Sequence, residues 1–271
     1  GNGCMNLTAV QITWRMQMKE TVDLFFEQTG QGIPLILVHG YPLDHTTWQP
    51  ILPLLRSDVR VILPDLRGFG KSPVTEGIYS MESLAGDVCA LMDQLNISRA
   101  VIIGHSMGGY VTLAFARLFP ERLLGIGLVG SKANADAPDK QAGRKEMADA
   151  IHQGGMQVTV ERMLPILTRD TGVAQQISGI MLSTSKQAGA GASLGMAERA
   201  DSTLLVRELN VPGLVMAGTD DPFSPLDASR ELAQSMKNAR LVKIDGAGHM
   251  MMMEQPQAVA AGLNDFLAQF T

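Results

Sequence analysis

Residues 101–113 read VIIGHSMGGYVTL, and this stretch decides the fold. An apolar run typical of a buried strand leads directly into GHSMGG (104–109), and apolar residues at helical spacing follow at once. Between a strand and a helix, a Gly-X-Ser-X-Gly string predicts a sharp turn whose serine has a strained backbone. We therefore expect Ser106 to be a nucleophile. In the alternative interpretation the glycines only make a tight turn.

The residues beside Ser106 also fit this hypothesis. Gly104 and Gly108 lack a Cβ, so strand and helix can approach closely around the serine. The amide of Met107 would then lie at a helix N-terminus, where the helix dipole and free N–H groups stabilise an oxyanion. We expect this amide to be one of two donors of an oxyanion hole.

The loop after an earlier strand is expected to supply the second donor. Residues 35–38 form an apolar run, and the Tyr41 amide follows it in the right place. His39, in the same loop beside Gly40, is expected to brace the loop rather than to act as a catalytic base.

The rest of the chain predicts an α/β fold with a mostly parallel central sheet flanked by helices. From Val22 onward short apolar runs alternate with amphipathic stretches, and the runs are near-continuously apolar, as in strands buried on both faces. One helix is expected to start after Ser80, and the helix from Met107 is expected to end near Pro120. The expected strands are residues 35–38, 59–63, 100–103, 124–129, 214–217 and 241–244.

The short apolar runs typical of strands are missing between residues 131 and 209, where apolar residues are spaced as in helices. We expect residues 132–209 to form a helical cap inserted into an α/β core of residues 18–131 and 210–271. The alternative is a surface excursion that does not contact substrate. Residues 1–17 are expected to be either a cloning remnant or an edge segment with a strand at 10–14.

Two other strand ends supply an acid and a base. GTDDP (218–222) follows one expected strand and DGAGH (245–249) follows another. A serine hydroxyl needs a base to take its proton, and the imidazole needs a carboxylate partner. The chain order serine, acid, histidine predicts His249 as the base. Asp221, just before a proline, is the expected acid, and Asp220 is the alternative.

The remaining histidines lack this setting. His45 opens a helix, His105 flanks the expected nucleophile, and His152 falls in the insertion. We expect each to be structural or to line the substrate site. Trp48, His105 and Met250 are the candidates for lining an apolar acyl pocket, and the alternative is that they are ordinary core residues.

Composition narrows the classes of partner. The net charge is −5 and there is no run of Lys or Arg, which disfavours nucleic acid and anionic lipid. No apolar run reaches the roughly 20 residues that span a bilayer. The two cysteines, Cys4 and Cys89, have neither a confident pairing nor metal-ligand spacing, which fits a reduced cytoplasm. We expect no metal and no organic cofactor, because a triad needs neither.

From about residue 22 to 270 the chain resembles the α/β-hydrolase superfamily, and most closely its carboxylesterases and 3-oxoadipate enol-lactonase-like members. The resemblance rests on HGYPLDHTTW (39–48), DLRGFGKS (65–72), GHSMGG (104–109), GTDDPF (218–223) and GAGHM (246–250). It also implies that residues 65–70 form a loop that supports the nucleophile turn, so that Asp65 and Arg67 are structural.

This resemblance implies hydrolysis of a small carboxylic ester, with a short to medium acyl chain, or of a lactone by two-step acyl transfer. Enol-lactonase, carbon–carbon bond hydrolase and perhydrolase activities use the same triad and stay open, as does a hydrolase-like ligand receptor. The serine disfavours dehalogenases and epoxide hydrolases, which resemble this chain but place an aspartate at that turn.

Overall fold

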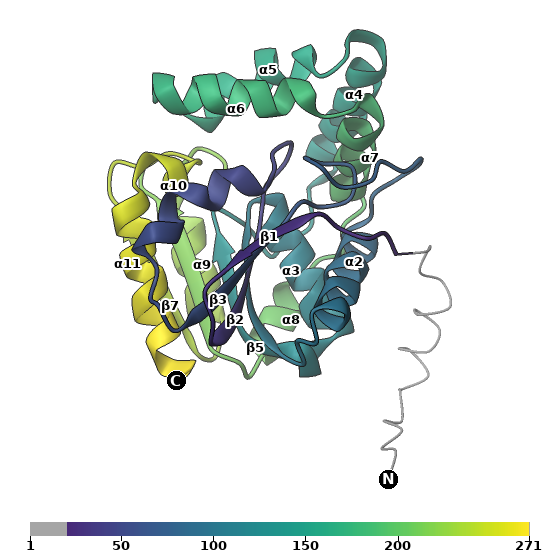
Figure 1. Cartoon of the computed structure of the whole chain (residues 1–271). Helices are drawn as coiled ribbons and strands as arrows, with labels where there is room; N and C mark the ends of the chain where they lie inside the picture. Colours follow the sequence, from purple (N-terminus) through teal and green to yellow (C-terminus); the bar gives the residue numbers. More distant parts are fainter. Residues whose placement is uncertain (1–20, 271) are drawn as a thin grey trace.

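The computed structural model describes residues 21–270, so the expectations for residues 1–17 lie outside the described residues. Within the described range a seven-stranded sheet has the order β1-β3-β2-β4-β5-β6-β7 (Figure 1). Only β1 (Phe26–Thr29) runs antiparallel to its neighbour in this sheet; the other neighbouring strands pair in parallel. The predicted α/β fold with a mostly parallel sheet is confirmed.

All six strands predicted from apolar runs are present. Burial on both faces holds for the central strands β4 and β6, but β7 is half-exposed because it lies at the edge of the sheet. The six are β2 (Ile33–Val38), β3 (Val59–Pro64), β4 (Ala100–His105), β5 (Leu123–Val129), β6 (Gly213–Gly218) and β7 (Ala239–Ile244).

Successive residues of each strand point to opposite faces of the sheet, and each face has its own helical layer. Ile36 and Val38 belong to one hydrophobic cluster with α2 (Met81–Gln94), α3 (Met107–Leu118) and α9 (Leu226–Ser235). Leu35 and Leu37 belong to the other, with η1 (His45–Leu54), α10 (Met251–Glu254) and α11 (Pro256–Leu267). The short turns η2 (Pro120–Arg122) and η3 (Ala268–Phe270) contain no fully buried residue.

The predicted helix starts are confirmed. The Ser80 side chain accepts a hydrogen bond from the Ser83 amide at 3.1 Å and so caps α2. Helix α3 starts at Met107, directly after Ser106, and ends before Pro120.

A helical insertion joins β5 to β6, as the sequence predicted. It contains α4 (Pro138–Gly154), α5 (Gln157–Leu167), α6 (Thr171–Ser183), α7 (Lys186–Ala197) and α8 (Thr203–Glu208). In Figure 1, α4–α7 gather beyond one end of the sheet. Helix α8 instead packs with the core, where Val206 joins the cluster of α2 and α3. No helix within residues 21–270 is long and apolar enough to cross a membrane.

Candidate active site

Ser106 lies at the turn between β4 and α3 with φ 51° and ψ −114°, a left-handed backbone that is rare for a residue with a side chain. Close packing fixes this turn. A Cβ on Gly104 would lie 2.0 Å from the carbonyl oxygen of Gly108, and one on Gly108 would lie 2.4 Å from that of Val38. The Ser106 amide donates to the Val129 carbonyl of the neighbouring strand at 2.9 Å. The surrounding structure therefore holds a strained serine at the carboxyl end of β4.

His249 and Asp221 form a buried pair. The distance between His249 Nδ1 and Asp221 Oδ2 is 2.8 Å, and the exposed fractions are 2% and 4%. Because an ionised carboxylate only accepts, Nδ1 carries the proton and Nε2 keeps its lone pair in the neutral ring. Burial opposes ionisation of Asp221, but the charge and hydrogen bond of His249 and the Phe223 amide together hold the pKa of Asp221 below its ordinary value. The pair has the geometry of a base and its orienting acid.

Asp220 occupies a different place. Its side chain is exposed and lines a separate hollow beside Thr168 and Glu254, and its amide donates to the Ala247 carbonyl at 3.0 Å. No contact between the Asp220 carboxylate and His249 occurs within the described chain. Of the two adjacent aspartates, Asp221 is the one that reaches the imidazole.

Ser106 and His249 open into one cavity of about 520 Å³ between the core and the inserted helices. No hydrogen bond joins Ser106 Oγ to His249 among residues 21–270, and such contacts often tighten only when substrate binds. The core lines the cavity with Tyr41, Ser106, Tyr110, Gly130, Phe223 and His249. The insertion adds Lys132, Asp136, Asp139, Lys140, Gly143, Arg144, Met147, Met163, Leu167, Ser193 and Met196.

The amides expected to form the oxyanion hole belong to Met107, next to Ser106 in the chain, and to Tyr41, in the cavity wall. Met107 is buried and opens α3, where the first amides have no intrahelical acceptor. Tyr41 follows β2 and lines the cavity, and its hydroxyl donates to the Gly189 carbonyl of α7 at 3.0 Å. Neither the Tyr41 nor the Met107 amide donates to another residue in the described part of the chain. Both N–H groups are therefore without an acceptor among residues 21–270.

His39 braces the loop after β2. One ring nitrogen, Nδ1, bonds the Gly40 carbonyl at 2.8 Å, and the other, Nε2, accepts from the Leu66 amide at 2.9 Å. Both nitrogens are thus used within the core. Burial lowers the pKa of His39, so the ring stays neutral.

Asp65 and Arg67 hold the loop of residues 65–72 in place. The Asp65 carboxylate accepts from the amide and Nδ1 of His45, at 2.9 and 2.7 Å, and from the Lys71 amide at 2.8 Å. Arg67 donates two hydrogen bonds to the Asp87 carboxylate, at 2.8 and 2.7 Å. Neither residue lines the cavity.

Asp44, His45 and Asp65 bring three potential metal-ligating atoms within 4.8 Å of one another. Each group already has a protein partner: Asp44 caps η1 through the Thr46 amide, and His45 bonds Asp65. His45 Nε2 also lies 3.2 Å from a Glu27 oxygen. The arrangement is accounted for by these contacts, without an ion.

The three residues expected to line the acyl pocket do not line it. Trp48, His105 and Met250 are fully buried and are absent from the cavity wall, so the structure corrects this expectation. His105 instead bonds the backbone carbonyl of His249 through Nε2 at 2.9 Å, and burial lowers its pKa to about 3. A neutral His105 therefore holds the loop that carries His249. His152 is exposed on α4 and is also absent from the cavity wall.

Several residues of the site were not predicted from the sequence. Ser131 donates through Oγ to the Ser106 carbonyl at 2.8 Å, and the ring centroids of Phe223 and His249 are 4.8 Å apart. Gly130 has φ 54° and sits where a Cβ would lie 3.1 Å from Asp221 Oδ2. The sequence could have indicated Gly130 and Ser131 as site residues. They directly follow β5, and the carboxyl ends of parallel strands meet at one edge of the sheet.

The chain is similar in sequence and in structure to known proteins. The chain is 39% identical to a thermophilic esterase from Thermogutta terrifontis, solved with malate bound, with a TM-score of 0.88 over 91% of this chain and 93% of that one. It is 29% identical to the enol-lactonase from Burkholderia xenovorans, with a TM-score of 0.83 over 90% and 96% of the two chains. It is also 29% identical to a 2-hydroxy-6-oxo-2,4-heptadienoate hydrolase from Pseudomonas putida, over 94% of this chain and 96% of that protein.

The family comparison covers most of the described core. Residues 33–256 match the family model described as alpha/beta hydrolase fold, a span that includes the nucleophile turn, the Asp221 loop, the His249 loop and the insertion. With this match and the observed sheet order, the chain belongs to the α/β-hydrolase family.

Proposed function

We propose that this protein is a serine hydrolase that cleaves carboxylic esters of short to medium acyl chain through an acyl-enzyme intermediate. The observation that carries the proposal is the Asp221–His249 contact of 2.8 Å beside the cavity that also exposes Ser106. A cavity of about 520 Å³ with several methionines and a leucine in its wall suits a small acyl group. The 39% identity to a solved esterase supports the same class.

In the proposed reaction, Ser106 Oγ attacks the ester carbonyl while His249 Nε2 takes its proton. Asp221 stabilises the imidazolium that forms. The Tyr41 and Met107 amides hold the oxyanion, and collapse of the intermediate expels the alcohol, which receives the proton from His249. Water, activated by the same imidazole, then releases the acid and restores Ser106. Residues 132–209, in this proposal, act as a cap that keeps bulk water from the acyl-enzyme.

The experiment is active-site labelling combined with turnover. A fluorophosphonate should add one adduct per chain, located on Ser106 by peptide mass, and should abolish hydrolysis of p-nitrophenyl butyrate. Ser106→Ala should lose both labelling and turnover. Ser193→Ala, a change at another serine of the cavity wall, should keep both. Turnover by Ser106→Ala at the wild-type rate would refute the nucleophile.

A carbon–carbon bond hydrolase is the second candidate, because the 2-hydroxy-6-oxo-2,4-heptadienoate hydrolase aligns over nearly the whole chain. Both reactions would use the same triad, so only substrate turnover separates them. A panel of p-nitrophenyl esters, an enol-lactone and a vinylogous diketone, each with and without hydrogen peroxide, compares the ester, lactone, carbon–carbon and perhydrolase activities. Ester hydrolysis is expected to have the largest kcat/KM of the panel.

A further inference from the structure

The wall of the cavity carries more positive than negative charge. Lys132, Lys140 and Arg144 face it, against Asp136 and Asp139. Moreover, one of the two carboxylates is already shared between two cations. Asp136 Oδ2 lies 2.8 Å from Arg199 Nη1 and also bonds Arg144 Nε. Asp136 is therefore committed to these two guanidinium groups, which leaves the lysines without it.

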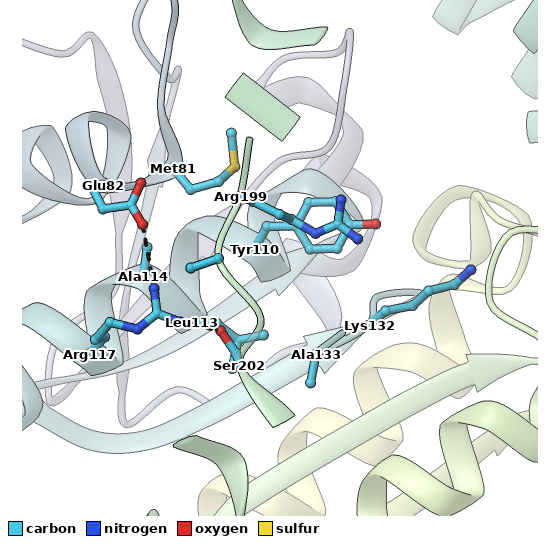
Figure 2. A pocket seen from close by; sticks show the side chains of 11 residues that line it. Met81, Glu82, Tyr110, Leu113, Ala114, Arg117, Lys132, Ala133, Arg199 and Ser202 are labelled. Carbon is cyan, nitrogen blue, oxygen red and sulfur yellow. Dashed lines mark hydrogen bonds and ion pairs between the residues drawn. The ribbon is translucent and has the colours of Figure 1, made fainter. Parts of the chain in front are cut away.

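Arg199 is itself fixed in place by its neighbours. Its guanidinium lies 4.0 Å above the centre of the Tyr110 ring, and its Nη2 donates to the Asn134 carbonyl at 2.9 Å. Figure 2 shows this stack among the side chains that line a small hollow. The hollow has a volume of about 10 Å³, which suits at most a water molecule. Arg199 does not line the larger cavity, and Asp136 links it to that cavity's wall.

Lys132 differs from these arginines because no described residue pairs with it by a hydrogen bond or ion pair, although the charges of Asp136 and Asp221 lie near enough to oppose the lowering of its pKa. Figure 2 shows its side chain extended away from Arg199 and Tyr110. The side chain is half-buried, and its ammonium makes no hydrogen bond or ion pair with any residue in the range 21–270. Burial and the charge of Lys140 together lower the pKa of Lys132. A half-buried ammonium without a partner raises the free energy of the empty site, and an anion in the cavity would relieve that cost.

The backbone at Lys132 is anchored to the nucleophile turn. Ser131, the preceding residue, donates through Oγ to the Ser106 carbonyl at 2.8 Å and accepts at its own carbonyl from Ser224 Oγ at 3.2 Å. The segment that carries the lysine is therefore held in a constant relation to the reacting serine.

We propose that Lys132 binds a carboxylate carried by the substrate, so that the enzyme prefers esters bearing a second, free carboxylate group. This inference rests on the proposed ester hydrolysis at the same site. Lys140 also lines the cavity but is exposed to solvent, so Lys132 carries the one half-buried ammonium of the wall as described in residues 21–270. A single carboxylate charge matches it, whereas a phosphate would call for further donors, and Asp136 already occupies the two arginines. The carboxylate can lie in the acyl part or in the alcohol part of the ester, and the experiment distinguishes the two.

The experiment compares esters of matched size and different charge by titration of the released acid. Monomethyl adipate is paired with methyl hexanoate for the acyl side, and 4-acetoxybutanoate with butyl acetate for the alcohol side. Methyl 6-aminohexanoate supplies a cation. A hydrogen bond to a charged group corresponds to about tenfold to hundredfold in rate, so at least one anionic ester should exceed its neutral partner in kcat/KM by about tenfold. The cationic ester should be the poorest of the acyl series.

Lys132→Met should lower this anionic-to-neutral ratio by about tenfold or more, and Lys132→Arg should retain most of it. Lys145→Met is the matched control, because it removes the same charge from an exposed position of α4 outside the cavity wall. The control should keep the wild-type ratio.

Two outcomes would overturn the inference. If neutral esters are hydrolysed but neither anionic ester is preferred, the proposed ester hydrolysis stands and the carboxylate site is wrong. If no ester is hydrolysed and Ser106 takes no fluorophosphonate label, the proposed function fails and this inference fails with it. The anionic-to-neutral ratio of kcat/KM is measured on the wild-type enzyme, so the preference for a carboxylate is tested even if Lys132→Met does not fold.

Discussion

His249 Nδ1 lies 2.8 Å from Asp221 Oδ2, although the two residues are 28 positions apart and come from loops after different strands. These strands, β6 and β7, are parallel neighbours, with Gly218 in register with Ile244. Both loops therefore leave the sheet at the same edge. The amides of Phe223 and Ser224 donate to the other carboxylate oxygen of Asp221, at 2.8 and 3.3 Å, which leaves Oδ2 directed at the imidazole.

This relationship predicts that the two adjacent aspartates contribute very unequally. Asp221→Asn removes the charge that stabilises the imidazolium and favours the wrong tautomer, so kcat for p-nitrophenyl butyrate should fall by roughly 10⁴-fold. Asp220→Asn changes an exposed side chain and should alter kcat by less than about threefold. Steady-state kinetics of both variants checks this, and a larger loss in Asp220→Asn would transfer the acid's role to Asp220.

The sequence predicted the sheet well because strands buried on both faces must be apolar over their whole length, as β4 is. It missed β1, whose residues Phe-Glu-Gln-Thr lie at a partly exposed edge and form no apolar run. Edge strands of this kind carry little signal, because solvent tolerates polar side chains there.

The lining of the site was harder to predict, since neighbours in sequence point in different directions. His105 and Met250 flank Ser106 and His249, yet both side chains are fully buried behind them. Lys132 was missed for another reason. A lone lysine after a strand forms no pattern, and only the fold shows that an insertion encloses it.

The tight nucleophile turn predicts that the stability of the protein depends strongly on Gly104. Gly104→Ala would place a Cβ 2.0 Å from the Gly108 carbonyl oxygen, so a backbone shift is unavoidable. The free energy of unfolding should fall by about 3 kcal/mol or more. Gly179→Ala is the control, because Gly179 is exposed on α6 and a Cβ there meets nothing within 4 Å. This substitution should stabilise the protein by about 0.5–1 kcal/mol. Urea unfolding measures both, and equal effects would contradict the close approach.

His45 predicts a pH-dependent contribution to stability. Burial alone would lower its pKa, but the hydrogen bond and charge of Asp65, with Asp44 and Glu27, raise the pKa above the ordinary value of 6.5. Because the folded pKa is raised, the contribution is fully present below about pH 6.5 and is lost as pH rises through the folded pKa. His45→Gln should therefore cost about 2 kcal/mol at pH 5.5 and less at pH 9.

Urea unfolding at pH 5.5, 7 and 9 checks the sign of this dependence. His152→Gln, at an exposed position of α4, serves as the control and should change stability by less than about 0.5 kcal/mol. A cost of His45→Gln that grows with pH would mean that the ring is not charged in the folded protein.

A buried ion pair ties the loop of residues 65–72 to α2. It joins Arg67 to Asp87, whose side chains are 6% and 0% exposed. Arg67→Met would leave the carboxylate buried without its cation and should lower the free energy of unfolding by about 3–5 kcal/mol. Burial already raises the pKa of Asp87 even beside Arg67, and loss of the cation raises it further. A raised folded pKa means that folding takes up a proton, so the loss should be smaller at pH 5 than at pH 7. The double variant Arg67→Met/Asp87→Leu removes both charges and should recover much of the lost stability. Urea unfolding of the two variants checks this. If the double variant is no more stable than Arg67→Met, the loss comes from packing and not from the unpaired charge.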